Sequence, residues 1–262
     1  MLKQPDYTSF AKFYDYFELE GTTETAELNV FLTEIFKKNN VKSVLDFACG
    51  TGAQSIGLAR NGFKVTAADL DEGMLKIASK KAKKEKVKII FQQGNMKNAK
   101  YGTFDAAICI FNAIGHLTRL ECSKFFQNAF KSLNEGGIFV FDILNFTALK
   151  TDIFDLYKHI DEEAEIDGWL VKRVRDCSLN RRLRQVSIKS YTAWNDTVHF
   201  DSLIENWQMQ IYDKDELVKM LDYAGFSKIE FFDQNGAPFD SNRSGSIFAV
   251  CKKGNKSLSK EL

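Results

Sequence analysis

A glycine-rich turn and an aspartate farther along the chain are the residues whose types and spacing could do chemistry. The segment Val44 to Gly52 runs from apolar residues into Gly50-Thr51-Gly52, which lets the backbone turn sharply and approach a ligand closely. Asp69 follows a second apolar run, where a carboxylate can accept hydrogen bonds from both hydroxyls of a ribose. Together they predict a site for a nucleotide-type cofactor.

Two features distinguish between the possible cofactors. A dinucleotide site has the pattern Gly-x-Gly-x-x-Gly, but this chain has Ser55 at the third glycine position. Asp46 precedes the turn, where it would repel a pyrophosphate and attract a cationic amino-acid group. Both features favour S-adenosylmethionine, which carries an ammonium and a sulfonium group.

The stretch from Val44 to Gly52 resembles the first motif of the class I S-adenosylmethionine-dependent methyltransferases. Later segments agree with that family in order and spacing: Asp69 followed by a turn and Met74, Gly94-Asn95-Met96 after a third apolar run, a fourth run ending at Phe111-Asn112, and Leu133 to Gly137 as the turn before a fifth strand. Position 95 is Asn where the family usually has Asp, and an amide can still pair with the adenine amino group.

The resemblance implies roles for individual residues. Asp69 is expected to hold the ribose, Asp46 and the loop from Ala48 to Gly52 the methionine part, and Asn95 with Met96 the adenine. The full set expected to bind the cofactor is Tyr14, Asp46, Ala48, Cys49, Gly50, Gly52, Asp69, Leu70, Met74, Gly94, Asn95, Met96, Phe111 and Asn112. No metal site is expected, because the chain has no Cys-x-x-Cys pair and no His at metal-ligand spacing.

The expected chemistry needs few residues. Methyl transfer from a sulfonium is an in-line displacement, so the protein mainly aligns the reactants and excludes water. A protonated amine must also lose a proton, and His116 titrates in a range that suits a base, although it could equally cap or pack beside the cofactor. Asp142 could orient a substrate ammonium or simply bond to backbone, and His199 is a weaker candidate base.

The N-terminal region is expected to cover this site. Tyr14-Asp15-Tyr16-Phe17 resembles a segment that folds over the cofactor in small-molecule methyltransferases, with Tyr14 the first expected contact and Tyr7 the second. The alternative is that these aromatic residues only pack in the core. If the segment is a lid, Tyr14 or His116 would relay the proton from the acceptor.

The elements that position these residues follow from the hydrophobic pattern. Strands and helices alternate as in a doubly wound, seven-stranded, mostly parallel α/β sheet, interrupted by a small antiparallel insert of three strands between Gly168 and Tyr212. A helix Lys214 to Ala224 and two last strands close the sheet. The predicted division is 1–40 as a helical cap, 41–149 and 211–254 as the cofactor-binding core, 150–210 as an insert forming a substrate lid, and 255–262 as a tail.

With such an insert, the whole arrangement resembles small-molecule N-methyltransferases, especially the amino-sugar N,N-dimethyltransferases and the glycine/sarcosine type. We therefore expect a small-molecule acceptor, such as an amine. Two alternatives stay open: an RNA or nucleotide-linked substrate, suggested by basic residues from Lys172 to Lys189, and a protein that binds S-adenosylmethionine without catalysis.

The composition of the chain limits which partners and which location can be expected. The 262 residues carry a formal net charge of +1, so no global field indicates nucleic acid or a membrane as partner. Five cysteines without a paired motif, an N-terminus without an apolar signal core and no stretch of transmembrane length predict a reduced, cytoplasmic protein. A monomer or a homodimer is expected.

Overall fold

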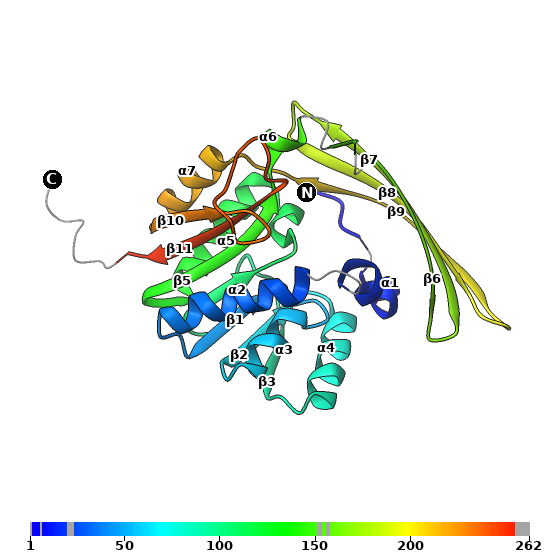
Figure 1. Ribbon diagram of the computed structural model, residues 1–262, viewed down its shortest axis with the longest axis horizontal. Coiled ribbons are helices and arrows are strands. Elements are labelled where there is room, and N and C mark those ends of the chain that lie inside the picture. Colours follow the sequence, from blue (N-terminus) through cyan, green and yellow to red (C-terminus); the bar gives the residue numbers. More distant parts are fainter. Residues whose placement is uncertain (1, 6, 20–23, 151–153, 156–157, 255–262) are drawn as a thin grey trace, which may run out of the picture.

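The computed structural model describes all residues except 1, 6, 20–23, 151–153, 156–157 and 255–262, so the predicted tail lies outside the described part. Figure 1 shows a sheet covered by helices and a second, curved sheet that projects from it. The first sheet has seven strands in the order β10-β11-β5-β4-β1-β2-β3, and the second has four in the order β6-β7-β8-β9. The predicted α/β fold class is confirmed.

The elements follow the chain in this order: α1 (Tyr7–Tyr14), the π-helix η1 (Asp15–Leu19), α2 (Glu24–Lys38), β1 (Ser43–Phe47), α3 (Ala53–Arg60), β2 (Lys64–Asp69), α4 (Glu72–Lys84), β3 (Ile89–Gln93), β4 (Phe104–Cys109), the 3₁₀-helix η2 (Ala113–His116), α5 (Arg119–Lys131), β5 (Leu133–Leu144), α6 (Phe146–Leu149), β6 (His159–Ile166), β7 (Trp169–Asn180), β8 (Gln185–Asn195), β9 (Phe200–Gln210), α7 (Lys214–Ala224), β10 (Phe226–Phe232) and β11 (Ser246–Lys253).

The direction of the strands determines where a ligand can bind. In the seven-stranded sheet only β11 runs antiparallel to its neighbours, because β10 pairs antiparallel with β11 and β11 with β5. The strand order reverses between β1 and β4, which pair in parallel. Loops after these two strands diverge to opposite faces, so their carboxyl ends leave a crevice.

Alternating strand residues form two hydrophobic layers, as expected for side chains of period two. On one face, Leu45 and Phe47 of β1 pack with residues of α5 and α7, including Phe125 and Leu221. On the other face, Val44 packs with residues of α2, α3 and α4. Burial on both faces explains why the parallel strands read as continuous apolar runs.

Two local predictions differ from the structure. The insert has four strands, because His159–Ile166 also pairs along β7. Charged residues dominate the sequence of this strand, so a strand-like alternation of apolar and polar residues is hard to recognise. The predicted turn Leu133 to Gly137 lies within β5, whose register with β4 shifts between Phe104 and Ala106.

The insert is joined to the core through its own small hydrophobic cluster. Phe146 and Leu149 of α6 pack with Val186 and Ile188 of β8 and with Ile211. Figure 1 shows α1 between the seven-stranded sheet and the insert. Among the described residues, no helix is both long and apolar enough to span a membrane.

Candidate active site

The glycine turn after β1 is held by the end of β2. Ala48, Gly50 and Gly52 have φ values of 57°, 52° and 87°, in the left-handed region that glycine adopts easily. The N–H of Cys49 donates to the carbonyl of Ala68 at 2.9 Å, and the N–H of Gly50 donates to the Asp69 carboxylate at 2.8 Å. The turn therefore ends at the first residues of α3 with its backbone close to Asp69.

Asp69 makes two backbone contacts and keeps capacity for a ligand. One oxygen accepts from Gly50 and the other accepts the N–H of Asp71 at 2.9 Å. A carboxylate offers about four acceptor positions, so hydroxyl groups of a ligand can still bind. Burial raises the pKa of Asp69, and the two backbone hydrogen bonds oppose that shift.

Asp46 is a buried carboxylate beneath the same turn. It is 2% exposed and accepts a hydrogen bond from the Ser55 hydroxyl at 2.5 Å. Burial raises its pKa to about 7, and the nearby Asp69 adds to that shift. A cationic group bound beside Asp46 would favour its ionised form, because opposite charges attract strongly away from water.

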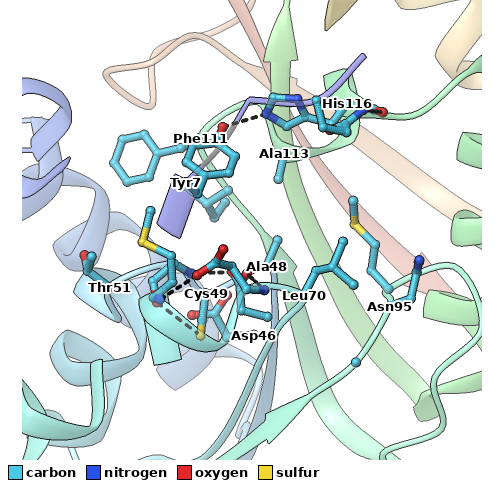
Figure 2. A pocket seen from close by; sticks show the side chains of 18 of the residues that line it. Tyr7, Asp46, Ala48, Cys49, Thr51, Leu70, Asn95, Phe111, Ala113 and His116 are labelled. Carbon is cyan, nitrogen blue, oxygen red and sulfur yellow. Dashed lines mark hydrogen bonds between the residues drawn. The ribbon is translucent and has the colours of Figure 1, made fainter. Parts of the chain in front are cut away.

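These groups border a cavity of about 390 Å³ at the carboxyl ends of β1, β2 and β4. Figure 2 shows Tyr7 and His116 at one side of it, and Asp46 beside the glycine turn. Of the expected cofactor residues, the lining includes Tyr14, Asp46, Ala48, Cys49, Gly50, Asp69, Leu70, Met74, Gly94, Asn95, Met96 and Phe111. It also includes the expected catalytic residue His116. Gly52, Asn112 and Asp142 are expected site residues outside the described lining.

The side of the cavity formed by the β3–β4 connection holds the expected adenine residues. The Asn95 side chain accepts the N–H of Lys97 at 3.0 Å, which leaves its amide nitrogen available for another partner. The carbonyl of Met96 accepts from Asn128 of α5 at 2.8 Å. Lys97 forms an ion pair with Glu121 at 2.7 Å, so its charge is already matched by a carboxylate.

Tyr7 and His116 form a hydrogen-bonded pair at the cavity wall. The Tyr7 hydroxyl lies 2.8 Å from His116 Nε2, and the two rings meet edge to face. His116 Nδ1 is buried and has no hydrogen-bond partner among the described residues. Burial lowers the pKa of His116 to about 4, so the imidazole is uncharged at neutral pH. Tyr7, the second choice from sequence, is thus the tyrosine that contacts His116.

Asp142 is bonded to the backbone of the turn that follows β4. It is 4% exposed, and both oxygens lie 3.2 Å from the backbone N–H of Asn112, which donates to them. Phe111 and Asn112 have φ values of 61° and 56°, an unfavourable conformation for two consecutive residues without glycine. Asp142 therefore stabilises the turn that leads from β4 to His116.

The insert contributes none of the residues that line the described cavity. Residues 150–210 were expected to form a substrate lid, but none of them is among the lining residues. Tyr7 and Tyr14 of α1 do line the cavity. His199 lies on the exposed turn after β8, where it pairs with Asp196. The insert packs on α1 through Val171 and Trp194, which contact Phe13, and its strand β9 contacts η2, the helix that carries His116.

Several lining residues were not predicted from the sequence: Gln4, Pro5, Ala53, Gln54, Asp71, Lys97, Ile110, Ala113, Leu117 and Glu121. Ala53 and Gln54 directly follow the glycine motif, and this position was the available signal. Gln4 gives no local signal. Its amide reaches the carbonyl of His116 at 2.7 Å only through the tertiary fold.

The cavity residues fit S-adenosylmethionine chemically. An ammonium and a sulfonium need nearby carboxylates, and the cavity has two: Asp46 is buried and Asp69 is half-buried. Burial raises the pKa of both. A ribose needs paired acceptors, and Asp69 retains free acceptor positions. Gly50 leaves room for a close approach, because a Cβ added there would have no heavy atom within 4 Å.

Comparisons with known proteins agree with this geometry. Residues 44–137 match the family described as "Methyltransferase domain". A putative methyltransferase from Geobacillus sp. (strain WCH70) is 28% identical over 254 residues, which cover 94% of this chain and 99% of that protein. Rabbit (Oryctolagus cuniculus) glycine N-methyltransferase is 30% identical over 141 residues, 47% of this chain and 48% of that protein.

A solved S-adenosylmethionine-dependent methyltransferase from Clostridium acetobutylicum ATCC 824 superposes with a TM-score of 0.80 at 21% identity, covering 95% of this chain and 99% of that one. A sugar N-methyltransferase from Streptoalloteichus sp. ATCC 53650 superposes with a TM-score of 0.76 at 18% identity, covering 92% of this chain and 93% of that one. At this level of identity the likeness shows the fold, including both the sheet and the insert.

Proposed function

We propose that this chain, which is an S-adenosylmethionine-dependent methyltransferase, methylates a small molecule at an amine nitrogen. The observation that carries this proposal is the cavity in which an uncharged His116 lies against Tyr7. Its volume of about 390 Å³ falls in the range of small-molecule sites, roughly 300–1,000 Å³.

The proposed cofactor contacts divide between the two ends of the cavity. Asp69 binds the ribose hydroxyls, and Asn95 with Met96 contacts the adenine. Asp46 and the loop from Ala48 to Gly52 hold the amino-acid part. When bound, S-adenosylmethionine supplies an electrophilic methyl group on its sulfonium.

The acceptor requires alignment and, if it is an ammonium, loss of a proton. His116 is uncharged and Nδ1 has no partner among the described residues, so the imidazole has capacity for one further hydrogen bond. The Tyr7 hydroxyl shares the other ring nitrogen. We infer that Tyr7 and His116 orient the acceptor nitrogen and pass its proton toward solvent, while Tyr14 helps to exclude water from the cavity.

Two observations favour a small amine over RNA. Four basic residues of the insert are already paired with carboxylates: Arg173 and Arg175 with Glu18 and Glu162, Arg184 with Asp213 and Glu216, and Lys172 with Asp161. Phosphate contacts would have to displace these carboxylates. In addition, a relative that matches 47% of the chain bears the name glycine N-methyltransferase.

The proposal is tested by incubating the protein with S-adenosylmethionine and separate sets of acceptors. The sets are amino acids such as glycine, free and nucleotide-linked amino sugars, the matching hydroxy sugars, and RNA. S-adenosylhomocysteine release and the mass of the acceptor are measured. We expect methylation in an amine set that His116→Ala and Tyr7→Phe each reduce. Methylation of hydroxyls or RNA alone would contradict the proposed acceptor.

A further inference from the structure

The two tyrosines that line the cavity come from a segment with little support of its own. Helix α1 has only eight residues and is followed directly by the five-residue π-helix η1. Isolated helices of this length are marginal in water, so tertiary contacts must hold them. The contacts of α1 and η1 therefore decide whether Tyr7 and Tyr14 stay over the cavity.

One set of contacts joins this segment to the cofactor-binding core. Asp15 of η1 accepts a hydrogen bond from Thr51 in the glycine turn and forms an ion pair with Lys81 of α4 at 2.7 Å. Thr8 of α1 donates to Asp71, which caps the start of α4. These contacts hold the side of α1 and η1 that faces the cavity.

A second set joins the other side of the segment to the insert. Phe13 is 1% exposed and packs with Val171 and Trp194. The Lys12 ammonium lies 4.0 Å from the centre of the Trp169 ring, a cation–π contact. The sheet of the insert, which Figure 1 shows beside α1, is thus a support for this helix.

Arg173 on β7 is the most buried charged residue of this support. Its side chain is 3% exposed, and Nη1 lies 2.6 Å from Glu18 of η1 while Nη2 lies 2.8 Å from Glu162 of β6. Nη2 also donates to the carbonyl of Phe17 at 3.3 Å, and the guanidinium lies 4.5 Å from the Phe17 ring centre. Arg175 shares both carboxylates, so two positive charges face two negative ones.

A planar guanidinium is well suited to this task. It binds the side chain, the backbone and the ring of η1 in fixed directions, which a flexible ammonium cannot do. Glu18 lies one turn after Tyr14, so fixing Glu18 also fixes the orientation of the preceding turn. We propose that Arg173 is a positioning residue: from the insert, it holds η1 so that Tyr7 and Tyr14 stay over the cavity.

The inference rests on the proposed function only because it takes Tyr7 and Tyr14 as site residues. Its test therefore needs no acceptor. Hydrogen exchange of residues 7–18 and S-adenosylhomocysteine affinity are measured for the full chain and for two variants, Arg173→Met and Glu18→Gln. Lys172→Met is the matched control, since Lys172 is half-exposed and its distance to Asp161 is 3.6 Å.

We expect both variants to speed exchange in residues 7–18 by at least about tenfold and to weaken S-adenosylhomocysteine binding about threefold to tenfold, with exchange in β1, β4 and β5 unchanged. The control should match the wild type. Glu18→Gln keeps Arg173 in place, so it tests the contact even if Arg173→Met folds poorly. Unchanged exchange in residues 7–18 for Glu18→Gln would overturn the proposal, as would equal acceleration throughout the core.

This design also separates the two proposals. If the variants loosen the lid as expected but no amine is methylated, the acceptor assignment fails and the positioning role stands. If amines are methylated and the lid exchanges at the wild-type rate in Glu18→Gln, the positioning role fails alone. Arg173→Lys should give intermediate exchange, because it retains the charge and loses the planar fork.

Discussion

Individual side chains at this site combine structural and ligand-binding roles. Asp69 both holds the N–H of Gly50 and faces the cavity, so its removal affects the turn and the ligand together. Asp142 accepts hydrogen bonds from the turn that carries His116. Such residues require experiments in which stability and binding are measured separately.

Replacement of Asp69 by Asn should weaken S-adenosylhomocysteine binding by roughly tenfold to a hundredfold. Hydrogen bonds to a charged group contribute about 1.5–3 kcal/mol, and every 1.4 kcal/mol is about tenfold in Kd. Calorimetric titration provides the measurement. Asp105→Asn is the control, because Asp105 also accepts two backbone N–H groups, those of Lys42 and Ser43. Asp105 lies at the amino end of β4, whereas the cavity lies at the carboxyl ends of the strands. Equal loss in both variants would contradict a direct contact.

Asp46 should couple cofactor binding to pH. Burial raises its pKa to about 7, so much of it is protonated at pH 6 in the free protein. A cationic ligand favours the carboxylate and releases that proton, so affinity should rise between pH 6 and 8. Calorimetric titration of the protein with S-adenosylmethionine, in buffers of different ionisation enthalpy, measures the number of protons released on binding. The Asp46→Asn variant should release fewer protons than the wild type. Because the pKa of neighbouring Asp69 is also raised, some release can remain, and the difference in released protons between variant and wild type is the contribution of Asp46.

At the scale of elements, helix starts determine much of the site. Helix α5 begins with a capping box in which Thr118 accepts the N–H of Glu121 and Glu121 accepts the N–H of Thr118. The same Glu121 carboxylate binds Lys97 beside the cavity. One helix terminus therefore fixes both α5 and the connection from β3 to β4.

Glu121→Gln should reduce stability by about 1 kcal/mol at pH 7, a magnitude typical of a cap or a partly exposed ion pair. The hydrogen bond from Lys97 is the main reason that the pKa of Glu121 falls to about 2, below its ordinary 4.5. A lowered carboxyl pKa stabilises the fold above pH 4.5, and this contribution disappears as the pH falls toward 2. Urea unfolding of both proteins at pH 7 and at pH 3 measures it. A difference that persists unchanged at pH 3 would argue against this cause.

For the whole molecule, ligand binding and folding are linked because the site spans distant parts of the chain. The lining runs from Gln4 in the N-terminal segment through the glycine turn to Glu121 at the start of α5. Unfolding any of these segments destroys the site. A ligand that binds only the folded chain must therefore stabilise all of them.

S-adenosylhomocysteine at a hundred times its Kd should raise the melting temperature by about 5–10 °C. The stabilisation at that concentration is about 2.7 kcal/mol, and a chain of this size shifts by roughly 2–4 °C for each kcal/mol. A thermal melt with and without ligand measures the shift, with NAD as the negative control. A shift with NAD and none with S-adenosylhomocysteine would contradict the assignment of the cofactor.

Features that depend on neighbouring residues could be predicted from the sequence. The apolar run before Gly50 and the acid at Asp69 predict the strand, the turn and the cofactor, because strand burial and glycine turns are read over a few residues. The family comparison and the fold confirm these predictions. Helix α7 begins and ends at the residues predicted for it.

Contacts between distant residues, in contrast, are established by the folded chain. Tyr7 and His116 are 109 positions apart in sequence, and their contact depends on how α1 packs between the core and the insert. The choice of Arg173 as the partner of Glu18 arises from the same packing. Local sequence patterns do not indicate such pairs. The free energy that selects them comes from burying complementary surfaces of whole elements against each other.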